Sequence, residues 1–453
     1  MPRELPGLYF DEEKNRYFPL SSKPKELPQP SQPGNDASRE NSSDSTDGED
    51  SRVDARRSRK RIQKRGPWAV TSELRSGPSY ACRHRFVHEF MHGQIASTSR
   101  VHPVSLPGNI SSFCVSDAGN RLRCAVGDNK GWLYQVFSIG SGRGEAWDEL
   151  GYIPRTFDEI RSRVLTWSHD LNLGSEISSI HNDGSKFVAT SLGPVCKVIV
   201  QDIATHPDRS FVLNFDTRKV ADVWTSYLDG PSLVMGARKK AVFIRDLDNT
   251  MQSFISLDTD SDVFAVQKDK DLVYAGARNG SLKRFDTRIH KHQHGRDLLS
   301  GRYQEKRSSI THMGLVNEWH LVVNGINGDL DMFDLRFSKH GTPVMAFPGH
   351  VNSFTRELGF TIDAESDLLF AAGQDARLRA WSLRTGDPLC TPTQVDRVDI
   401  TNPFGTVFER HVQTLRVTRA KDEVMLWANT GKDLLVYLLG RRSRGAPNFF
   451  RTV

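Results

Sequence analysis

The chain of 453 residues contains no long hydrophobic run, since no apolar stretch approaches the roughly 20 residues needed to span a bilayer. Its first ten residues, MPRELPGLYF, also lack the apolar core of a secretion signal. Only five cysteines occur, and they are scattered without CxxC spacing. An odd and dispersed set is typical of reduced thiols, so we expect a protein of the nucleus or cytoplasm that makes no membrane contact.

Motifs that carry catalysis or hold a cofactor are also missing. The sequence has no GxSxG elbow, no Walker loop and no paired-carboxylate constellation. The net charge of +6 among 26% charged residues is only mildly basic, which alone does not indicate a nucleic-acid partner. We therefore expect a protein that is not an enzyme and that binds no cofactor.

One apparent exception is His88-Glu89-Phe90-Met91-His92, which matches the HExxH pattern of zinc proteases. No Glu occurs between Glu89 and Glu145, and no histidine follows at the metzincin spacing, so the third zinc ligand is absent. The alternating histidines of RIHKHQHG, at 288–295, are equally weak evidence. We predict no functional metal site at either place.

The N-terminal part differs in composition from the rest. Residues 1–20 form a short aromatic motif, whereas 21–66 is rich in Ser, Pro, Asp and Glu and is expected to be disordered. Within it, the basic tract RRSRKRIQKR at 56–65 fits a nuclear import signal and leaves nucleic-acid binding as a lesser alternative. The lead-in segment 67–108 contains a candidate docking helix at 79–95, because apolar residues recur there at i,i+4.

A sequence motif that recurs in the second half of the chain is the strongest indication of the fold. Each copy has an apolar strand, a Gly, a short turn, an alternating strand, an aromatic residue, and finally an acidic or polar residue, any residue and Arg. The spacing of about 48 residues is close to the period of a propeller blade. The copies read VYAGARNGSLKRFDTR at 273–288, VVNGINGDLDMFDLR at 322–336 and FAAGQDARLRAWSLR at 370–384.

Four weaker copies complete the array, each with three short strands separated by turn residues. They occupy 110–137, 177–203, 220–248 and 411–439. With a fourth strand in each intervening segment, the pattern predicts an all-β fold, a seven-bladed propeller over 109–445, and disfavours a solenoid. We expect a strand within 95–106 to pair with the last blade and close the ring, in preference to the C-terminal segment.

The turns within the clear copies are predicted to be tight hairpins. Asn279-Gly280 and Asn327-Gly328 suit the two central positions of a type I′ turn, which require positive φ. Asp375-Ala376 takes the same place in the third copy.

The Asp-x-Arg endings of these copies are the candidate binding residues. Asp286 with Arg288 and Asp334 with Arg336 follow the third strands of neighbouring blades, so both arginines should emerge on one rim, with Arg384 beside them. Guanidinium groups suit the carboxylates and main-chain carbonyls of a protein partner. The alternative is a local Asp–Arg pair without a partner, because exposed pairs of this kind are common.

These residues resemble the WD-repeat family, and the FDxR endings at 285–288 and 333–336 resemble its WDxR box. Proteins with that box are often substrate receptors of cullin-four RING ubiquitin ligases, which dock on the damage-specific DNA-binding-protein adaptor. The N-terminal phrase LPGLYFD at 5–11 is similar to the opening of the fourth-member-like subfamily of these DCAF receptors. The resemblance implies adaptor contacts at Arg288 and Arg336 with Asp286 and Asp334 orienting them, and a weaker contact at Arg384, where Ser382 replaces the acid.

Our leading hypothesis is a non-catalytic substrate receptor of a cullin-RING ubiquitin ligase, which presents a target protein for ubiquitination. The alternative is a WD-repeat scaffold of a nuclear protein or ribonucleoprotein assembly with no ligase role.

Overall fold

The structure is a computed structural model that divides into two compact units, Met1–Gly77 and Pro78–Val453. It describes residues 8–11, 16–19, 100–105, 108–117, 122–138, 165–203, 210–249, 254–289, 293–299, 308–337, 341–389, 403–420 and 423–439. The predicted disordered tail at 21–66, its basic tract, the candidate helix at 79–95 and the HExxH match all lie outside these residues.

In the first unit, the described part is a hairpin of two strands. β1 (Leu8–Asp11) pairs antiparallel with β2 (Arg16–Pro19), so that Tyr9 lies opposite Phe18 and Phe10 opposite Tyr17. The aromatic motif of the N-terminus therefore forms its own small β-element.

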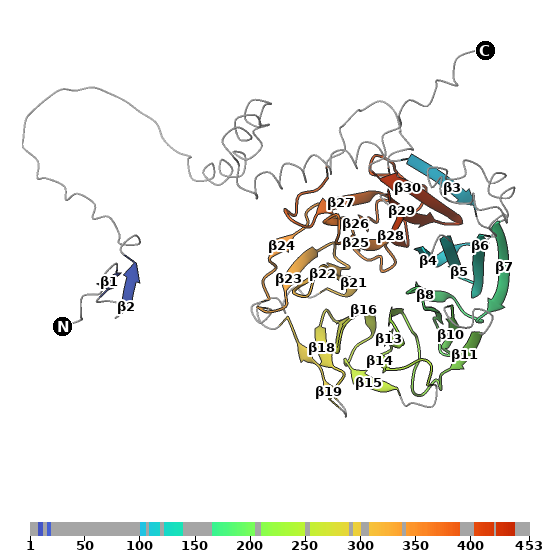
Figure 1. The fold of residues 1–453 in the computed structure, drawn as a ribbon, viewed down its shortest axis with the longest axis horizontal. Helices are drawn as coiled ribbons and strands as arrows, with labels where there is room; N and C mark the ends of the chain where they lie inside the picture. The colour runs from blue at the N-terminus through green and yellow to red at the C-terminus, as the bar shows by residue number, and fades with distance from the viewer. Residues whose placement is uncertain are drawn as a thin grey trace, which may run out of the picture. The chain divides into compact units, whose positions relative to one another are not determined.

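The second unit is a β-propeller of seven blades arranged around a central axis (Figure 1). Blade 1 consists of β4 (Ile110–Asp117), β5 (Leu122–Asp128), β6 (Trp132–Ser138) and β7 (Leu165–Asn172), and blade 2 of β8 (Ile177–Asn182), β9 (Lys186–Ser191), β10 (Lys197–Asp202) and β11 (Ser210–Asn214). Blade 3 consists of β12 (Thr225–Asp229), β13 (Ser232–Ala237), β14 (Lys240–Ile244) and β15 (Ile255–Asp258), with the short β19 (Gln293–His294) pairing in parallel at its edge.

The remaining blades follow the same order from the axis outward. Blade 4 consists of β16 (Val263–Asp269), β17 (Leu272–Ala277), β18 (Leu282–Asp286) and β20 (Arg296–Asp297), and blade 5 of β21 (Ile310–Leu315), β22 (His320–Gly325), β23 (Leu330–Asp334) and β24 (Met345–Ala346). Blade 6 has, among the described residues, β25 (Phe360–Asp363), β26 (Leu368–Ala372) and β27 (Leu378–Ser382). Blade 7 consists of β28 (Leu415–Ala420), β29 (Glu423–Thr430), β30 (Asp433–Leu439) and β3 (Arg100–Ser105). The predicted seven-bladed all-β fold is confirmed, and the described residues contain no helix.

The ring is closed by a strand from the N-terminal side. β3 pairs antiparallel with β30, from Arg100 opposite Leu438 to Ser105 opposite Asp433. This strand lies inside the segment 95–106 in which we expected it. Blade 7 thus combines strands from both ends of the array, and loss of β3 would expose the outer edge of β30.

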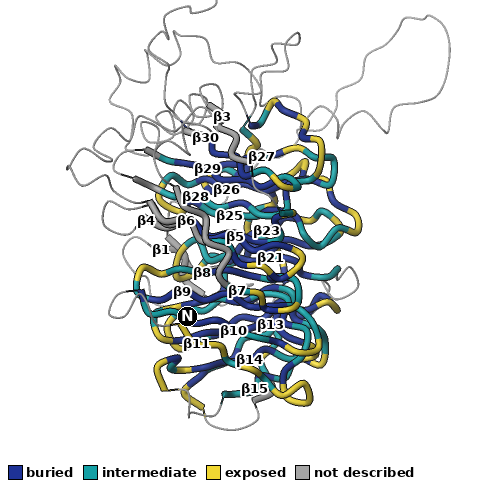
Figure 2. The backbone as a smooth tube through the Cα atoms, turned by 90° about the vertical axis from the view of Figure 1, so that its right-hand side faces the viewer, coloured by how far each residue is buried: buried dark blue, intermediate teal, exposed yellow. Residues whose placement is uncertain are grey.

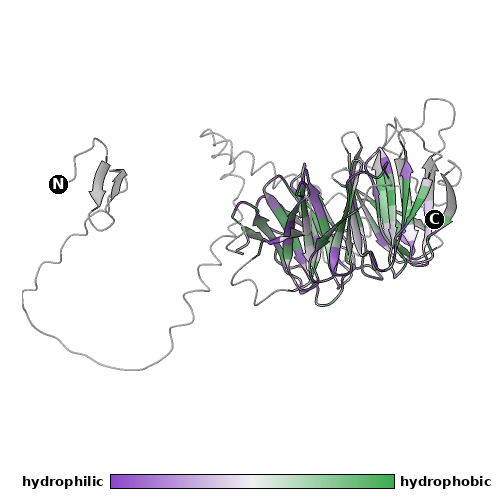
Figure 3. Cartoon of the chain, turned by 90° about the horizontal axis from the view of Figure 1, so that it is seen from below, coloured by the Kyte–Doolittle hydropathy of each residue, from purple (hydrophilic) through white to green (hydrophobic). Residues whose placement is uncertain are grey.

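Hydrophobic packing occurs between the blades. Seven clusters of buried apolar residues are present, and each combines side chains from two neighbouring blades, so that every interface around the ring has one. The second strand of a blade is the most completely buried, as in β9 and β13, where all residues are buried. Buried segments run through the strands and exposed ones gather in the turns (Figure 2). Hydrophobic residues likewise concentrate in the strands (Figure 3).

The prediction of type I′ turns is wrong. In the hairpin after β17, only Gly280 among residues 278–280 has positive φ, at 76°. Gly280 N–H donates to the Ala277 carbonyl at 3.0 Å and Ala277 N–H donates to the Ser281 carbonyl at 2.9 Å, which defines a three-residue loop with a bulge at the glycine. The Asn279 side-chain oxygen accepts hydrogen bonds from the amide and hydroxyl of Ser281, at 3.1 and 2.7 Å, and this local contact favours the longer loop.

The other two clear copies repeat this loop. Gly328 and Ala376 have φ values of 90° and 55° at the corresponding positions. Their backbone hydrogen bonds have the same pattern, from Gly328 to the Gly325 carbonyl and from Ala376 to the Gly373 carbonyl, each at 3.1 Å.

Candidate functional site

The rim on which the Asp-x-Arg residues lie is defined by backbone hydrogen bonds. Thr287 N–H donates to the Asp271 carbonyl, and Leu335 N–H donates to the Trp319 carbonyl, both at 2.8 Å. Leu383 N–H makes the matching bond to Asp367 at 2.9 Å. The end of each third strand therefore lies beside the turn between the first and second strands of its blade. We call the edge formed by these turns in blades 4, 5 and 6 the Asp-x-Arg rim.

In blade 4, Asp286 and Arg288 form a bidentate ion pair, which we call an Asp–Arg fork. Arg288 Nε donates to Asp286 Oδ1 at 2.9 Å, and Nη2 donates to Oδ2 at 2.6 Å. The Arg288 amide adds a bond to Oδ1 at 3.1 Å, so the carboxylate is held from both sides. These hydrogen bonds lower the pKa of Asp286 to about 2. The Arg288 side chain nevertheless remains 68% exposed.

Blade 5 repeats the pair almost atom for atom. Arg336 donates from Nε to Asp334 Oδ1 at 3.0 Å and from Nη2 to Oδ2 at 2.6 Å. The hydrogen bonds from Arg336 lower the pKa of Asp334 to about 2. The Arg336 side chain is 49% exposed. The structure thus contains the local pairs that the sequence left as an alternative, and it leaves both guanidinium groups accessible.

Arg384 in blade 6 is held differently. Its Nε donates to Asp367 Oδ2 at 2.5 Å, across the blade's first turn, and its amide donates to Ser382 Oγ at 3.2 Å. Because Ser382 stands where the other copies have Asp, the guanidinium pairs with a carboxylate from another turn. Arg384 lies on the same rim but does not repeat the pair of blades 4 and 5.

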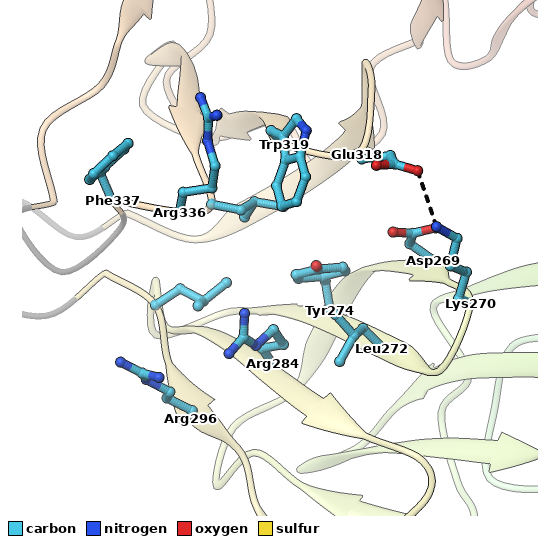
Figure 4. A pocket seen from close by; sticks show the side chains of 12 residues that line it. Asp269, Lys270, Leu272, Tyr274, Arg284, Arg296, Glu318, Trp319, Arg336 and Phe337 are labelled. Carbon is cyan, nitrogen blue, oxygen red and sulfur yellow. Dashed lines mark hydrogen bonds and ion pairs between the residues drawn. The ribbon is translucent and has the colours of Figure 1, made fainter.

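Aromatic side chains surround Arg336, and the sequence reasoning missed them. The guanidinium carbon lies 5.4 Å from the centre of the Trp319 ring and 5.7 Å from that of Phe337, within the range of cation–π attraction. Figure 4 shows Arg336 between the two rings. Trp319 is 47% exposed and Phe337 is 68% exposed, which is unusual for large apolar side chains. Trp319 in a polar turn and Phe337 directly after the box were the available signals.

A pocket of about 530 Å³ opens beside these residues, between blades 4 and 5. Blade 4 contributes apolar Leu272, Tyr274 and Leu298, and the cations Arg284 and Arg296 lie across the pocket from Arg336 (Figure 4). The ion pair of Lys270 Nζ with Glu318 Oε1, at 3.1 Å, joins the first turns of the two blades. The lining residues are Asp269, Lys270, Leu272, Tyr274, Arg284, Arg296, Leu298, Glu318, Trp319, Leu335, Arg336 and Phe337.

The described residues offer little for metal or membrane chemistry. Within them, no group of three or more His, Cys, Asp or Glu side chains could hold a metal ion. His88, His92, His290 and His292 lie outside the described part of the chain. No helix in that part is long and apolar enough to cross a bilayer.

Comparison with known proteins gives the fold and several relatives. No protein-family model matches the chain. The WD40 β-propeller domain of Doa1 superposes with a TM-score of 0.53 at 11% identity, over 78% of this chain and 100% of that chain, which shows the fold. A WD repeat-containing protein of Caenorhabditis elegans is 27% identical over 208 residues, which are 43% of this chain and 36% of that protein.

Two human proteins are also similar. DDB1- and CUL4-associated factor 4-like protein 2 is 30% identical over 139 residues, 30% of this chain and 33% of that protein. DDB1- and CUL4-associated factor 4 is 29% identical over 150 residues, 32% of this chain and 29% of that protein. The chain thus spans about one third of the length of each curated relative it matches. The fold is therefore that of a WD40 β-propeller, and the sequence is similar to a WD repeat-containing protein and to these two factors.

Proposed function

We propose that this chain is a non-catalytic substrate receptor of a cullin-RING ubiquitin ligase and that it docks on the ligase adaptor through the Asp-x-Arg rim. The observation that carries the proposal is the matched pair of Asp–Arg forks on blades 4 and 5, both accessible at one rim. The names of the similar human proteins associate those proteins with DDB1 and CUL4, which supports the same partner class.

Pairing with a neighbouring aspartate prepares each arginine for docking. The fork uses Nε–H and one N–H of Nη2, so three of the five guanidinium N–H groups remain for carbonyl or carboxylate oxygens of a partner. The aspartate also holds a long side chain in one orientation before binding, which reduces the entropy lost on association. The same fork recurs in blade 5, so two donors are presented in a fixed relationship.

Trp319 and Phe337 would supply the apolar part of this interface. Exposed aromatic side chains next to an arginine are the residue types that dominate measured binding energy at protein interfaces. Both rings lie against Arg336, and the adjoining pocket gives a partner side chain room to enter between blades 4 and 5. Docking here would leave the opposite rim free for a target protein, which the ring would hold close to the ubiquitin-charged enzyme.

The test is a pull-down of the adaptor with the full chain and with a double variant, Arg288→Ala with Arg336→Ala. Arg238→Ala with Arg278→Ala is a matched control, because these arginines are 65% and 67% exposed and pair with aspartates in turns of the opposite rim. We expect the first double variant to lose the adaptor and the control to retain it. Equal recovery by all three proteins would contradict docking at this rim and would favour a WD-repeat scaffold with no ligase role.

A further inference from the structure

A second cavity lies at the axis of the propeller, away from the Asp-x-Arg rim. It has a volume of about 260 Å³, and the innermost strand of every blade contributes to its lining. Figure 1 shows β4, β8, β16, β21, β25 and β28 among these strands, around the centre of the ring. We call this cavity the axial cavity.

The axial cavity belongs to the end of the ring opposite the Asp-x-Arg rim. Its lining comes mainly from the beginnings of the innermost strands. Ser309, directly before β21, donates its hydroxyl to the Arg278 carbonyl at 2.6 Å, so these beginnings lie beside the loop that joins the second and third strands. β18 runs from that loop to Asp286, and the two sites are therefore at opposite ends of the blades.

Two groups in the axial cavity can only donate hydrogen bonds, and neither has an acceptor within hydrogen-bonding distance among the described residues. Arg416 Nε and Trp224 Nε1 are buried and unpartnered among the described residues. A guanidinium and an indole N–H have no acceptor capacity, so whatever satisfies them must present acceptor atoms. Leaving such donors buried and unpaired is costly.

Two histidines add adaptable groups to the same lining. His181 Nε2 and His312 Nδ1 are also buried without a partner among the described residues. Burial lowers the pKa of both rings to about 3, and the charge of Arg416 at His181 and of Arg356 at His312 lowers it further. At neutral pH each ring is uncharged and can turn either a donor or an acceptor nitrogen toward a ligand.

The charges at the cavity are compensated unevenly. Arg356 pairs with Glu357 and stacks over Trp224 at 4.4 Å, and Glu176 lies within the electrostatic influence of both. No ion pair of Arg416 is present within the part of the chain that the structure describes. Arg416 is half-buried with its Nε enclosed, and a partly desolvated charge without a counter-ion favours an anion beside it.

We propose that the axial cavity binds a small oxyanion, a carboxylate or a phosphate, whose oxygens accept hydrogen bonds from Arg416 and Trp224. The volume of about 260 Å³ limits the ligand to a small molecule or to a single group of a larger one. The inference does not rest on the proposed ligase role, because it uses residues at the other end of the ring.

The experiment is thermal unfolding and calorimetric titration of the full chain with sodium phosphate and, separately, sodium citrate, at an ionic strength matched with sodium chloride. At saturating concentration we expect one of the two anions to raise the unfolding midpoint by about 2–4 °C. The arm that responds identifies phosphate or carboxylate as the bound class. No shift with either anion would mean that water alone fills the cavity, and this would overturn the proposal.

Variants assign the effect to the site. Arg416→Gln should remove the anion-dependent shift while leaving the midpoint in chloride no lower than that of the wild type, because it removes an uncompensated charge. Trp224→Phe keeps an aromatic ring at this position but removes the N–H together with part of the indole, and should raise the dissociation constant about fivefold. Arg238→Gln, an exposed change outside the cavity, should behave as the wild type. An equal shift in the wild type and in Arg416→Gln would overturn the proposal.

Discussion

Blades 5 and 6 carry an arginine at the same place on the same rim, and the two arginines are held in different ways. Arg336 forms a bidentate ion pair with Asp334, two residues earlier, and lies between two aromatic rings. Arg384 finds a serine at that position and reaches Asp367 in another turn with its Nε. One side chain two residues before the arginine therefore decides where the guanidinium points.

Arg336 is held in a position where a partner can bind it, whereas Arg384 stabilises its own blade. A fork to the preceding Asp fixes the side chain while leaving N–H groups for a partner, whereas the bond from Arg384 to Asp367 joins two turns of its own blade. We therefore rank Arg336 and Arg288 above Arg384 as contacts for a partner.

The largest effect is expected for Arg336→Ala. Loss of charge-assisted hydrogen bonds together with the cation–π contacts should weaken adaptor binding by about tenfold to a hundredfold, more than Arg288→Ala does. Biolayer interferometry with the purified adaptor would measure both. The ranking of blades fails if Arg384→Ala weakens binding as much as Arg336→Ala.

Trp319→Ala should have the next largest effect, about a tenfold loss of affinity, because an exposed aromatic beside an arginine is a typical centre of binding energy. Trp132→Ala is the matched control, since Trp132 is also exposed but lies at the start of a third strand, on the opposite rim. Unchanged binding by Trp319→Ala would limit the contact to the arginines.

Arg384→Ala should change adaptor affinity by about twofold or less and unfolding free energy by less than about 1 kcal/mol, because an exposed ion pair contributes little. Chemical denaturation and the same interferometry assay would measure the two quantities. A loss of affinity above about tenfold would show that blade 6 takes part in docking as fully as blade 5.

The smallest effect concerns the titration of Asp334. Its pKa is lowered from 3.8 to about 2 by hydrogen bonds from Arg336, so the pair contributes stability above pH 3.8 and loses it as the pH falls toward 2. Carboxyl NMR should find Asp334 ionised at pH 3 in the wild type and titrating at a higher pH in Arg336→Ala. Titration at the same pH in both proteins would show that the fork is not populated in solution.

Much of the fold follows from local pattern. The recurring strands, the aromatic residue and the Asp-x-Arg ending were enough to predict seven blades and a common rim, because each blade repeats the same short contacts. The type I′ turns were predicted wrongly, because the conformation at Asn279 depends on hydrogen bonds that Ser281 donates to its side chain, which an Asn-Gly pair does not specify.

Contacts between turns were beyond the reach of the sequence. Trp319 meets Arg336 only because the first turn of blade 5 lies beside the end of its third strand. Arg416 is similarly hidden, since a polar residue in an innermost strand looks like any solvent-facing residue until the ring places it at the axis. Contacts of this kind can be predicted only once the arrangement of the blades around the axis is known.

The most direct test of the docking claim is a cryo-electron microscopy structure of the full chain bound to the adaptor. Our account predicts that the adaptor covers the Asp-x-Arg rim, with the guanidinium groups of Arg288 and Arg336 within hydrogen-bonding distance of adaptor oxygens. A complex in which the adaptor sits on the opposite rim and both arginines face solvent would contradict it.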